Sequence, residues 1–215
     1  MADCILKNGK RIGDYKKPYF VAEMNSSHNG NVATAKRMID EAARIGCDAV
    51  KFQSWTAKTL YSKNYYDENP IARRMVSRFA LDKDQLKELS VYCKEKKIDF
   101  SSTPYSKDEL DFLVDECGAS FVKIASMDIN NLKFLRQVAE KGIAIVLSTG
   151  MATMDEIKSA VDTIKSAGNS NICVLHCVSV YPVEEKNVNL NNMMAIRNEL
   201  GTLPVGYSDH TVGEV

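Results

Sequence analysis

Seven short apolar runs recur along this chain, and segments with helical periodicity separate them. The runs read YFVAEM, AVKFQ, DFSST, SFVKIAS, AIVLST, NICVLHCVSVY and LPVGYSDH. Between the first two runs, apolar residues recur at spacings of three and four, as in an amphipathic helix: Val32, Ala35, Ile39, Ala42 and Ala43. Strands that alternate with helices pair in parallel through right-handed crossovers. The chain is therefore expected to form either a doubly wound sheet or a β/α barrel.

The helix boundaries are marked by residues that typically cap a helix. Ser106 with Glu109 and Thr153 with Glu156 have the spacing of a capping box. The long polar segment 56–78, after the second apolar run, is expected to include an irregular loop. Glycines that follow helical segments predict C-terminal stops at Gly46, Gly118, Gly142, Gly168 and Gly201.

A tight hairpin is predicted near the N-terminus. Asn8 and Gly9 form a two-residue turn signature between the short apolar flanks of segment 5–12. A chain of 215 residues can bury one sizeable core. We therefore expect a hairpin flap over residues 1–17 and one β/α domain over residues 18–215.

The composition limits the classes of partner. Twenty-eight basic residues balance 28 acidic ones, so no bulk positive field exists to hold nucleic acid or an anionic membrane. No stretch reaches the roughly 20 apolar residues of a membrane span, and the start MADCILKNGKR lacks the apolar core of a signal peptide. The sequence contains neither a GxGxxG motif nor a P-loop, so it gives no indication of a nucleotide-binding site. We expect a cytoplasmic protein that acts on a small molecule.

The cysteines carry no CxxC pair, and most lie inside apolar patterns, so we expect them to be reduced and structural. Cys173 and Cys177 share a face of one strand and could contact a metal, but small buried apolar side chains are the favoured interpretation. The six are Cys4, Cys47, Cys93, Cys117, Cys173 and Cys177.

Polar residues recur at the carboxyl ends of the apolar runs, and their parity within each run agrees. Alternate residues of a strand share one face, so each set could point into one barrel mouth. The sets are Glu23 with Asn25, Lys51 with Gln53, Ser101 with Thr103, Val146 with Ser148, and Gly206 with Ser208 and His210.

Lys51 and Lys123 lie inside apolar strands, where an ammonium group is costly to bury. Each of them could reach outward to water, pair with a carboxylate such as Glu23, or meet an anionic ligand. Hydroxyl groups near the strand ends could cap helices or hold phosphate and carboxylate oxygens: Thr103, Ser126, Ser148 and Ser208. Together, the lysines and hydroxyls predict a pocket for a small, highly anionic substrate at the active face of a β/α barrel.

The three histidines are expected to differ in role. His176 has the opposite parity from Ser179 and Tyr181, so it is predicted to pack toward the helices. His28 lies in the loop after the first strand, where it could order the loop or contact a ligand. His210, at a strand end, is the best metal candidate of the three, although one histidine does not make a metal site.

The ordered motifs are similar to those of the sialic acid (N-acetylneuraminate) synthase family, which includes legionaminic and pseudaminic acid synthases. They read AEMNSSHNG, VKFQ, SSTPYS, VKIAS, LSTGM, LHCVSVYP and GYSDHT, in order from about Tyr19 to the last residue. The resemblance implies a TIM (β/α)8-type barrel. This chain would hold its N-terminal portion, about seven β/α units, without the closing strand or the C-terminal antifreeze-like domain.

The resemblance also implies condensation of phosphoenolpyruvate with N-acetylmannosamine or a related hexosamine to give a sialic acid-type sugar acid and phosphate. The implied catalytic residues are Glu23, Lys51 and Lys123. The residues implied to hold phosphoenolpyruvate are Lys51, Thr103, Lys123, Ser126, Ser148, Ser179 and Ser208. The acceptor would face Glu23, Gln53 and Tyr181. His210 would bind a divalent ion, typically Mn²⁺ with Mg²⁺ as the alternative.

This chain departs from the family pattern in three ways. Ser179 stands where relatives often carry asparagine, and Asp128 stands where some carry glutamate. The segment 67–70 aligns poorly, so the identity of the hexosamine stays open. The family barrel also has an eighth strand with a second metal histidine, and an antifreeze-like domain that reaches the partner subunit in a homodimer. Complete barrels of this class need about 250 residues, so we expect a longer natural protein or an impaired product ending at Val215.

Two other functions fit the same residues. One is a Schiff-base aldolase in which Lys51 or Lys123 acts as the nucleophile. The other is a non-catalytic fragment that retains the anion pocket without a complete metal site.

Overall fold

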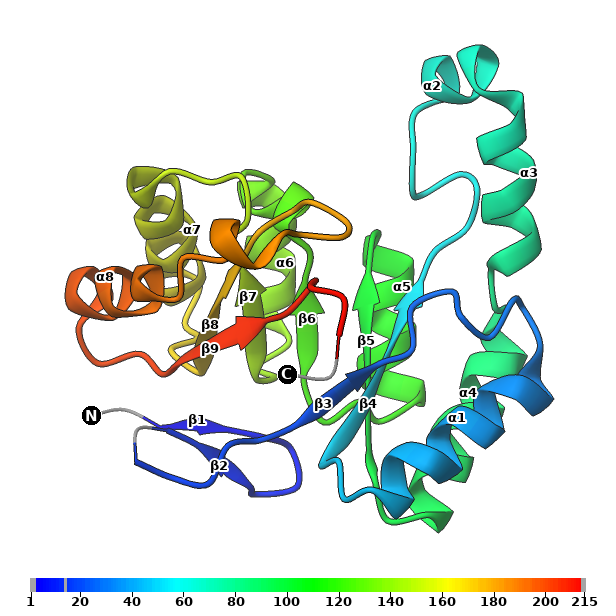
Figure 1. Cartoon of the computed structure of the whole chain (residues 1–215), viewed down its shortest axis with the longest axis horizontal. Helices are drawn as coiled ribbons and strands as arrows, with labels where there is room; N and C mark the ends of the chain where they lie inside the picture. The colour runs from blue at the N-terminus through cyan, green and yellow to red at the C-terminus, as the bar shows by residue number, and fades with distance from the viewer. Residues whose placement is uncertain (1–2, 14, 214–215) are drawn as a thin grey trace. The chain divides into compact units, whose positions relative to one another are not determined.

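A computed structural model of the chain describes residues 3–13 and 15–213; the chain end at Val215 lies outside them (Figure 1). The chain divides into two compact units, which we describe separately. One unit comprises Met1–Pro18 with Lys123–Val215, and the other comprises Tyr19–Val122. The described residues contain no helix that is both long and apolar enough to cross a membrane.

The Tyr19–Val122 unit is built on parallel strands. In sequence order, β3 pairs with β4, β4 pairs with β5, and Ser102 of β5 pairs with Val122 at the start of β6. Large apolar side chains such as Phe52, Leu89 and Leu113 are fully buried in its core. The strands are β3 (Val21–Glu23), β4 (Ala49–Ser54) and β5 (Asp99–Pro104), and β6 (Val122–Ile124) starts at the last residue of this unit and continues into the other. The helices are α1 (Val32–Arg44), α2 (Lys63–Glu68), α3 (Pro70–Phe79), α4 (Lys83–Glu95), α5 (Lys107–Asp111) and a π-helical turn at Phe112–Glu116.

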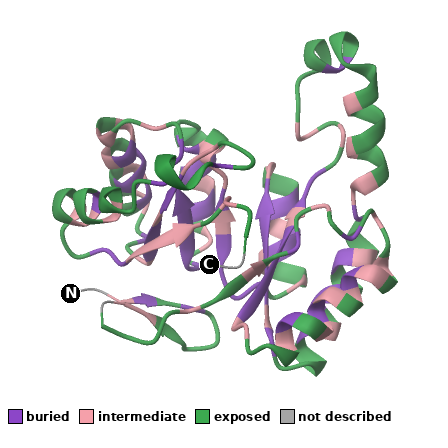
Figure 2. Cartoon of the chain, viewed as in Figure 1, coloured by how far each residue is buried: buried purple, intermediate pink, exposed green. Residues whose placement is uncertain are grey.

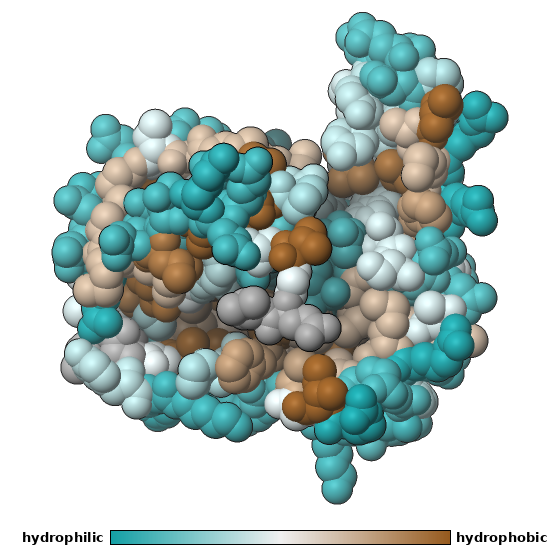
Figure 3. All heavy atoms as spheres, in the orientation of Figure 1, coloured by the Kyte–Doolittle hydropathy of each residue, from teal (hydrophilic) through white to brown (hydrophobic). Residues whose placement is uncertain are grey.

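Two helices, α2 and α3, occupy most of the segment that was expected to include an irregular loop. Within 55–79, regular structure is missing at 55–62, between β4 and α2, and at Asn69, between the two helices. The Ser62 hydroxyl caps α2, and Pro70 occupies the first turn of α3, where its missing N–H has no helical partner to lose. In Figure 1 both helices extend away from the β3–β5 sheet of their unit. Figure 3 shows apolar side chains among hydrophilic ones on this projection, consistent with the exposure of Ile71 and Met75.

The other unit contains the predicted N-terminal hairpin and three further paired parallel strands. Strands β7, β8 and β9 pair in sequence order, and α8 packs against β8 and β9. Asn171 holds the hairpin: its Oδ1 accepts from the Ile5 N–H at 2.6 Å, and its Nδ2 donates to the Ile5 carbonyl at 2.5 Å. The strands are β1 (Cys4–Ile5), β2 (Arg11–Ile12), β7 (Ile145–Ser148), β8 (Ile172–Cys177) and β9 (Val205–Ser208). The helices are α6 (Leu132–Glu140), α7 (Met154–Ser166), α8 (Asn191–Leu200) and short 3-10 turns at Ser126–Asp128 and Glu185–Asn187.

Burial differs among the parallel strands (Figure 2). Strands β4 and β7 are almost fully buried, whereas β9 is half-buried along its length and β3 has two exposed residues out of three. Short or partly exposed strands of this kind occur at sheet edges, where backbone groups lack a partner strand on one side.

The predicted helix caps are confirmed in one case and partly wrong in the other. Thr153 and Glu156 form the complete capping box. Ser106 accepts from the Glu109 N–H, but the Glu109 carboxylate instead accepts from the Tyr105 N–H at 2.8 Å and from the Thr59 hydroxyl at 2.6 Å. Glu109 therefore ties the loop after β4 to α5. The five predicted helix-stop glycines all have positive φ, between 66° and 91°.

The strand register places the polar positions in layers. Glu23, Lys51 and Ser101 are aligned across β3, β4 and β5, and Gln53 is aligned with Thr103 in the next layer. In the other unit, the first layer contains Ser148, Leu175 and Gly206, and the next aligns Cys177 with Ser208. Because aligned residues of parallel strands share a face, the predicted parity is confirmed for the residues within the strands; Asn25 and His210 lie beyond the ends of β3 and β9.

Gly30 provides a test of how α3 is attached to the sheet. A Cβ at Gly30 would lie 2.3 Å from the Arg78 carbonyl oxygen near the end of α3, whereas a Cβ at Gly46 would meet open space. Both residues have positive φ, so an alanine at either position adds backbone strain of about 1–2 kcal/mol. We expect Gly30→Ala to lower the free energy of unfolding by at least about 1 kcal/mol more than Gly46→Ala, measured by urea denaturation. Equal losses would show that α3 does not rest on Gly30.

Candidate functional site

The Lys51 side chain is the most buried charged group among the predicted site residues of the Tyr19–Val122 unit. Its side chain is 7% exposed, it forms an ion pair with Glu23, and its Nζ donates to the Thr103 hydroxyl at 3.4 Å. Of the three possibilities that the sequence left open for Lys51, the structure shows the carboxylate pair. The paired charge makes burial of the ammonium group tolerable.

Glu23 is also positioned by the backbone. Its side chain is 45% exposed, and its Oε1 accepts from the Asn25 N–H at 3.0 Å. An ammonium group has three donors, and the described residues occupy two of those on Lys51. The group therefore has a donor left for an anion next to a carboxylate that is open to water.

The neighbouring polar residues of this unit have separate roles. Gln53 is half-buried on the same face as Thr103. The Ser101 hydroxyl is fully buried and donates to the Phe121 carbonyl at 2.8 Å, so it links adjacent chain segments. Thr103, by contrast, is fully buried with its hydroxyl toward Lys51. The structure thus brings together Glu23, Lys51 and Thr103 of the predicted site.

The other unit gathers polar side chains around Gly150, which follows β7. The Gly150 N–H donates to Ser126 Oγ at 3.1 Å and to Cys177 Sγ at 3.2 Å, and these two side-chain atoms are themselves 3.2 Å apart. A Cβ on Gly150 would lie 2.2 Å from Ser179 Oγ. We call Ser126, Gly150, Cys177 and Ser179 the Gly150 cluster.

Ser148 and Ser208 belong to the same end of this unit. Ser148 is fully buried, and its hydroxyl has no hydrogen-bond partner among the residues that the structure describes. Ser208 lies beside Cys177 in the strand register. Lys123 is half-buried in β6. An unpartnered buried hydroxyl costs about 1–3 kcal/mol, so the Ser148 hydroxyl is available to a bound ligand or a water molecule.

His210 and Tyr181 lie together in this unit. Their ring centroids are 4.2 Å apart, and His210 Nδ1 donates to the Val178 carbonyl at 2.7 Å. The donor role of Nδ1 leaves Nε2 as the atom with a lone pair, which suits a metal ligand. However, residues 3–13 and 15–213 contain no group of three His, Cys, Asp or Glu side chains that could hold a metal ion. These residues alone do not fit a complete metal site.

The other two histidines have structural roles. His176 is buried, donates from Nε2 to the Val188 carbonyl at 2.7 Å and stacks on Tyr207, which confirms the predicted packing on the helical side. His28 Nδ1 accepts from the Gly30 N–H at 3.0 Å within its loop. Burial lowers the pKa of His28, which favours this neutral acceptor form.

The cysteines are free thiols, as predicted. Burial raises the pKa of Cys4 and of Cys93 to about 12 and that of Cys117 to about 11, and it also raises the pKa of Cys173. These four thiols are therefore protonated at neutral pH, as expected for structural residues.

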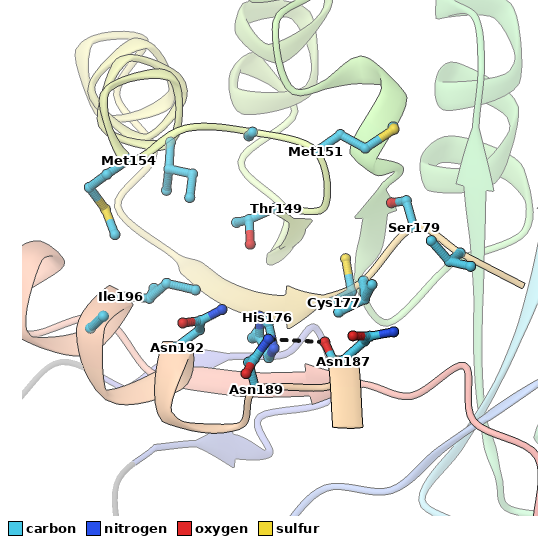
Figure 4. A pocket seen from close by; sticks show the side chains of 15 residues that line it. Thr149, Met151, Met154, His176, Cys177, Ser179, Asn187, Asn189, Asn192 and Ile196 are labelled. Carbon is cyan, nitrogen blue, oxygen red and sulfur yellow. Dashed lines mark hydrogen bonds between the residues drawn. The ribbon is translucent and has the colours of Figure 1, made fainter. Parts of the chain in front are cut away.

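A cavity of about 420 Å³ lies next to the Gly150 cluster and shares Cys177 and Ser179 with it (Figure 4). Asparagine amides and methionine side chains line it, and none of its lining residues is an acid, lysine or arginine. Sequence reasoning missed this cavity, although the asparagine-rich stretch KNVNLNN gives part of it. Its lining suits a neutral group rather than phosphate. The lining residues that sequence reasoning missed include Met151, Met154, Asn187, Asn189 and Asn192.

The Lys51–Glu23 pair leads to a stability prediction. Glu23→Gln removes the charge that compensates a buried ammonium, so we expect the free energy of unfolding to fall by about 1 kcal/mol, a modest value because Glu23 is half-exposed. Glu41→Gln removes an ion pair with Arg44 in which both side chains are exposed, and it should change stability by less than about 0.5 kcal/mol. Urea denaturation at pH 7 measures both. Equal effects would contradict a structural role for the buried pair.

Comparisons with known proteins identify the family of the chain. Residues 38–215 match the NeuB family profile. The chain is 39% identical over 209 residues to N,N'-diacetyllegionaminic acid synthase of Campylobacter jejuni, with 92% of this chain and 62% of the relative covered. It is 32% identical over 205 residues to N-acetylneuraminate-9-phosphate synthase of Drosophila melanogaster, with 92% and 55% covered. The chain thus spans about 55% to 62% of the length of these relatives.

A solved structure supports the same assignment. The sialic acid synthetase of Leptospira borgpetersenii, crystallised with citrate, matches at a TM-score of 0.89 and 33% identity, with 99% of this chain and 71% of that chain covered. The predicted fold class is therefore confirmed: the chain has seven parallel strands with helices, and it matches a partial TIM-type barrel. The family resemblance of the motifs is confirmed as well, since the chain belongs to the NeuB family.

Proposed function

We propose that this chain provides the phosphoenolpyruvate-binding residues of a nonulosonic acid synthase. The proposed reaction condenses phosphoenolpyruvate with N-acetylmannosamine or a related hexosamine and releases phosphate. The observation that carries the proposal is the buried Lys51 ammonium, held by Glu23 and Thr103 at the carboxyl ends of parallel strands. The names of the relatives, which are synthases of sialic and legionaminic acids, support the same class of product.

The donor is a small polyanion with a carboxylate at one end and a phosphate at the other. Lys51 and Lys123 would offset its charge, since ammonium groups in a poorly solvated site interact strongly with anions. Hydroxyl donors would hold its oxygens in a fixed geometry; the proposed donors are Thr103, Ser126, Ser148, Ser179 and Ser208. The buried hydroxyl of Ser148, without a described partner, supports this assignment most directly.

We propose a reaction that begins with attack of phosphoenolpyruvate on the open-chain sugar. The enol carbon of phosphoenolpyruvate forms a carbon–carbon bond with the aldehyde carbon of the open-chain sugar, and the aldehyde oxygen takes up a proton. Water then adds to the resulting oxocarbenium carbon, and phosphate leaves with cleavage of its carbon–oxygen bond. Glu23 would orient or deprotonate this water, because its carboxylate is open to solvent and already held by Lys51 and Asn25.

The acceptor is proposed to contact Glu23, Gln53 and Tyr181. Tyr181 is 73% exposed and lies against His210, so its ring can cover a sugar without being removed from a packed core. Ser179 and Asp128 depart from the family pattern, and we propose that acceptor contacts at these positions differ accordingly.

Further family properties remain proposals for this chain. His210 would contribute one ligand to a divalent ion, Mn²⁺ or Mg²⁺, with the remaining ligands supplied from outside the described residues. Such an ion would polarise the aldehyde oxygen. A cytoplasmic location and a homodimeric full-length form are proposed on the same basis.

The Schiff-base alternative is not favoured by the geometry. A nucleophilic lysine must be neutral, and it is usually activated by an apolar pocket or a nearby cation. Lys51 instead forms an ion pair with the Glu23 carboxylate. The anion-binding fragment differs from the proposed enzyme only in turnover, so activity must be measured.

The test is condensation by the full-length protein, followed as release of inorganic phosphate and formation of the sugar acid with a panel of hexosamines. We expect turnover in the wild type and a loss of at least about 30-fold in kcat/KM for phosphoenolpyruvate in Lys51→Met, because a charged hydrogen bond of about 2 kcal/mol is lost. Lys58→Met, in the loop after β4, is the control and should stay within about twofold of the wild type. Pyruvate-dependent trapping of a lysine by borohydride, without phosphate release, would contradict the proposal.

A further inference from the structure

We propose that Cys177 is a positioning residue: it holds the side chain of the Gly150 cluster that donates a hydrogen bond to a bound anion. Its thiol, together with the Gly150 N–H, would hold the Ser126 oxygen in the position from which the Ser126 hydroxyl can donate to an anionic group. The inference rests on the proposed function for the identity of that anion, phosphoenolpyruvate. It assigns a role to a residue that the motif comparison does not place among the ligand contacts.

The contacts of Cys177 set it apart from a core cysteine. Its Sγ lies 3.2 Å from Ser126 Oγ and 3.2 Å from the Gly150 nitrogen, and the Gly150 N–H is shared with Ser126 Oγ at 3.1 Å. The three groups therefore form a closed triangle of hydrogen bonds. Cys173 lies on the same face of β8 as Leu175 and Cys177, in the alternate-residue pattern of the strand, and is equally buried. Its thiol has no hydrogen-bond partner among the described residues.

The direction of these bonds determines where the Ser126 proton can point. The Gly150 N–H donates to Ser126 Oγ, so the hydroxyl hydrogen of Ser126 must point elsewhere. A thiol is both a weak donor and a weak acceptor, so Cys177 can accept that hydrogen without competing strongly for it. When an anion binds, the hydroxyl can turn to it at little cost, while the thiol continues to hold the serine oxygen in place.

The backbone at Gly150 is shaped for this arrangement. A Cβ there would lie 2.2 Å from Ser179 Oγ, 2.9 Å from Ser126 Oγ and 3.1 Å from Cys177 Sγ. Only glycine allows three polar side chains to approach one peptide unit so closely. The cluster thus depends on close contact between side chains and backbone, and loss of the thiol would leave room for Ser126 to move.

Ser148 points independently to a ligand at this end of the unit. It lies two residues before Gly150 at the end of β7, and its fully buried hydroxyl has no partner among the described residues. Buried hydroxyls are nearly always hydrogen-bonded in folded proteins. A bound anion that contacts Ser148 and Ser126 would satisfy both groups.

The test compares Cys177→Ala, Cys177→Val and Cys177→Ser with Cys173→Ala in the full-length protein. We expect Cys177→Ala and Cys177→Val to raise KM and Kd for phosphoenolpyruvate about tenfold, which corresponds to about 1.4 kcal/mol, with KM for the hexosamine unchanged. Cys177→Ser keeps a donor and an acceptor and should stay within about threefold of the wild type. Cys173→Ala removes an equally buried thiol and should lower stability without changing KM for phosphoenolpyruvate.

The outcomes separate this inference from the proposed function. If the wild type binds phosphoenolpyruvate and Cys177→Val binds it equally well, the positioning role is overturned while the proposed function stands. Valine fills the space of the thiol, being larger by about one methyl group, and cannot form a hydrogen bond, so equal binding by this variant overturns the positioning role even if Cys177→Ala does not fold. If the wild type itself binds no phosphoenolpyruvate by calorimetry, the proposed function is overturned and the inference with it.

Discussion

The register of the parallel strands is the constraint on which the rest of the structure depends. Because aligned residues share a face, the register of β3, β4 and β5 places Glu23, Lys51 and Ser101 in one layer. A slip of one residue in β4 would turn Lys51 toward the helices and separate it from Glu23 and Thr103. The same rule aligns Cys177 with Ser208. The strand pairing thus determines which polar side chains lie next to one another.

Burial then determines which polar residues are structural and which remain available. Ser101 is fully buried and donates to a backbone carbonyl, whereas Ser148 is fully buried without a described partner. Lys51 is compensated by a single half-exposed carboxylate. Burial alone therefore does not identify a ligand contact; the hydrogen bonds that a buried polar group lacks are more informative.

Much of the fold could be predicted from the sequence because it depends on local patterns. Strand positions follow from short apolar runs, the capping box at Thr153 follows from side-chain spacing, and the hairpin turn follows from the Asn8–Gly9 pair, in which Gly9 has a positive φ of 83°. The two helices within 56–78 were missed because the segment is polar and α3 buries none of its residues. The apolar side chains of α3 are not part of a buried core, so they did not predict a packed helix.

The site was less accessible to sequence reasoning because its contacts are long-range. The motif resemblance pointed to Lys51 and Glu23, and the structure shows their pairing. The reach of Glu109 to Thr59 and the triangle around Gly150 join residues that are 24 to 51 positions apart. No periodicity or spacing rule encodes such contacts.

We propose that Lys51 and Ser148 each contribute to binding phosphoenolpyruvate, and thermal unfolding followed by circular dichroism tests this proposal most directly. A ligand that binds only the folded state at about a hundredfold excess over Kd adds about 2.7 kcal/mol, so the account predicts a rise in Tm of about 5–10 °C with phosphoenolpyruvate. At the same ligand concentration, the rise should shrink to about 2–3 °C or less in Lys51→Ala. A cooperative transition of the wild type that does not respond to phosphoenolpyruvate, with or without Mn²⁺, would contradict the account.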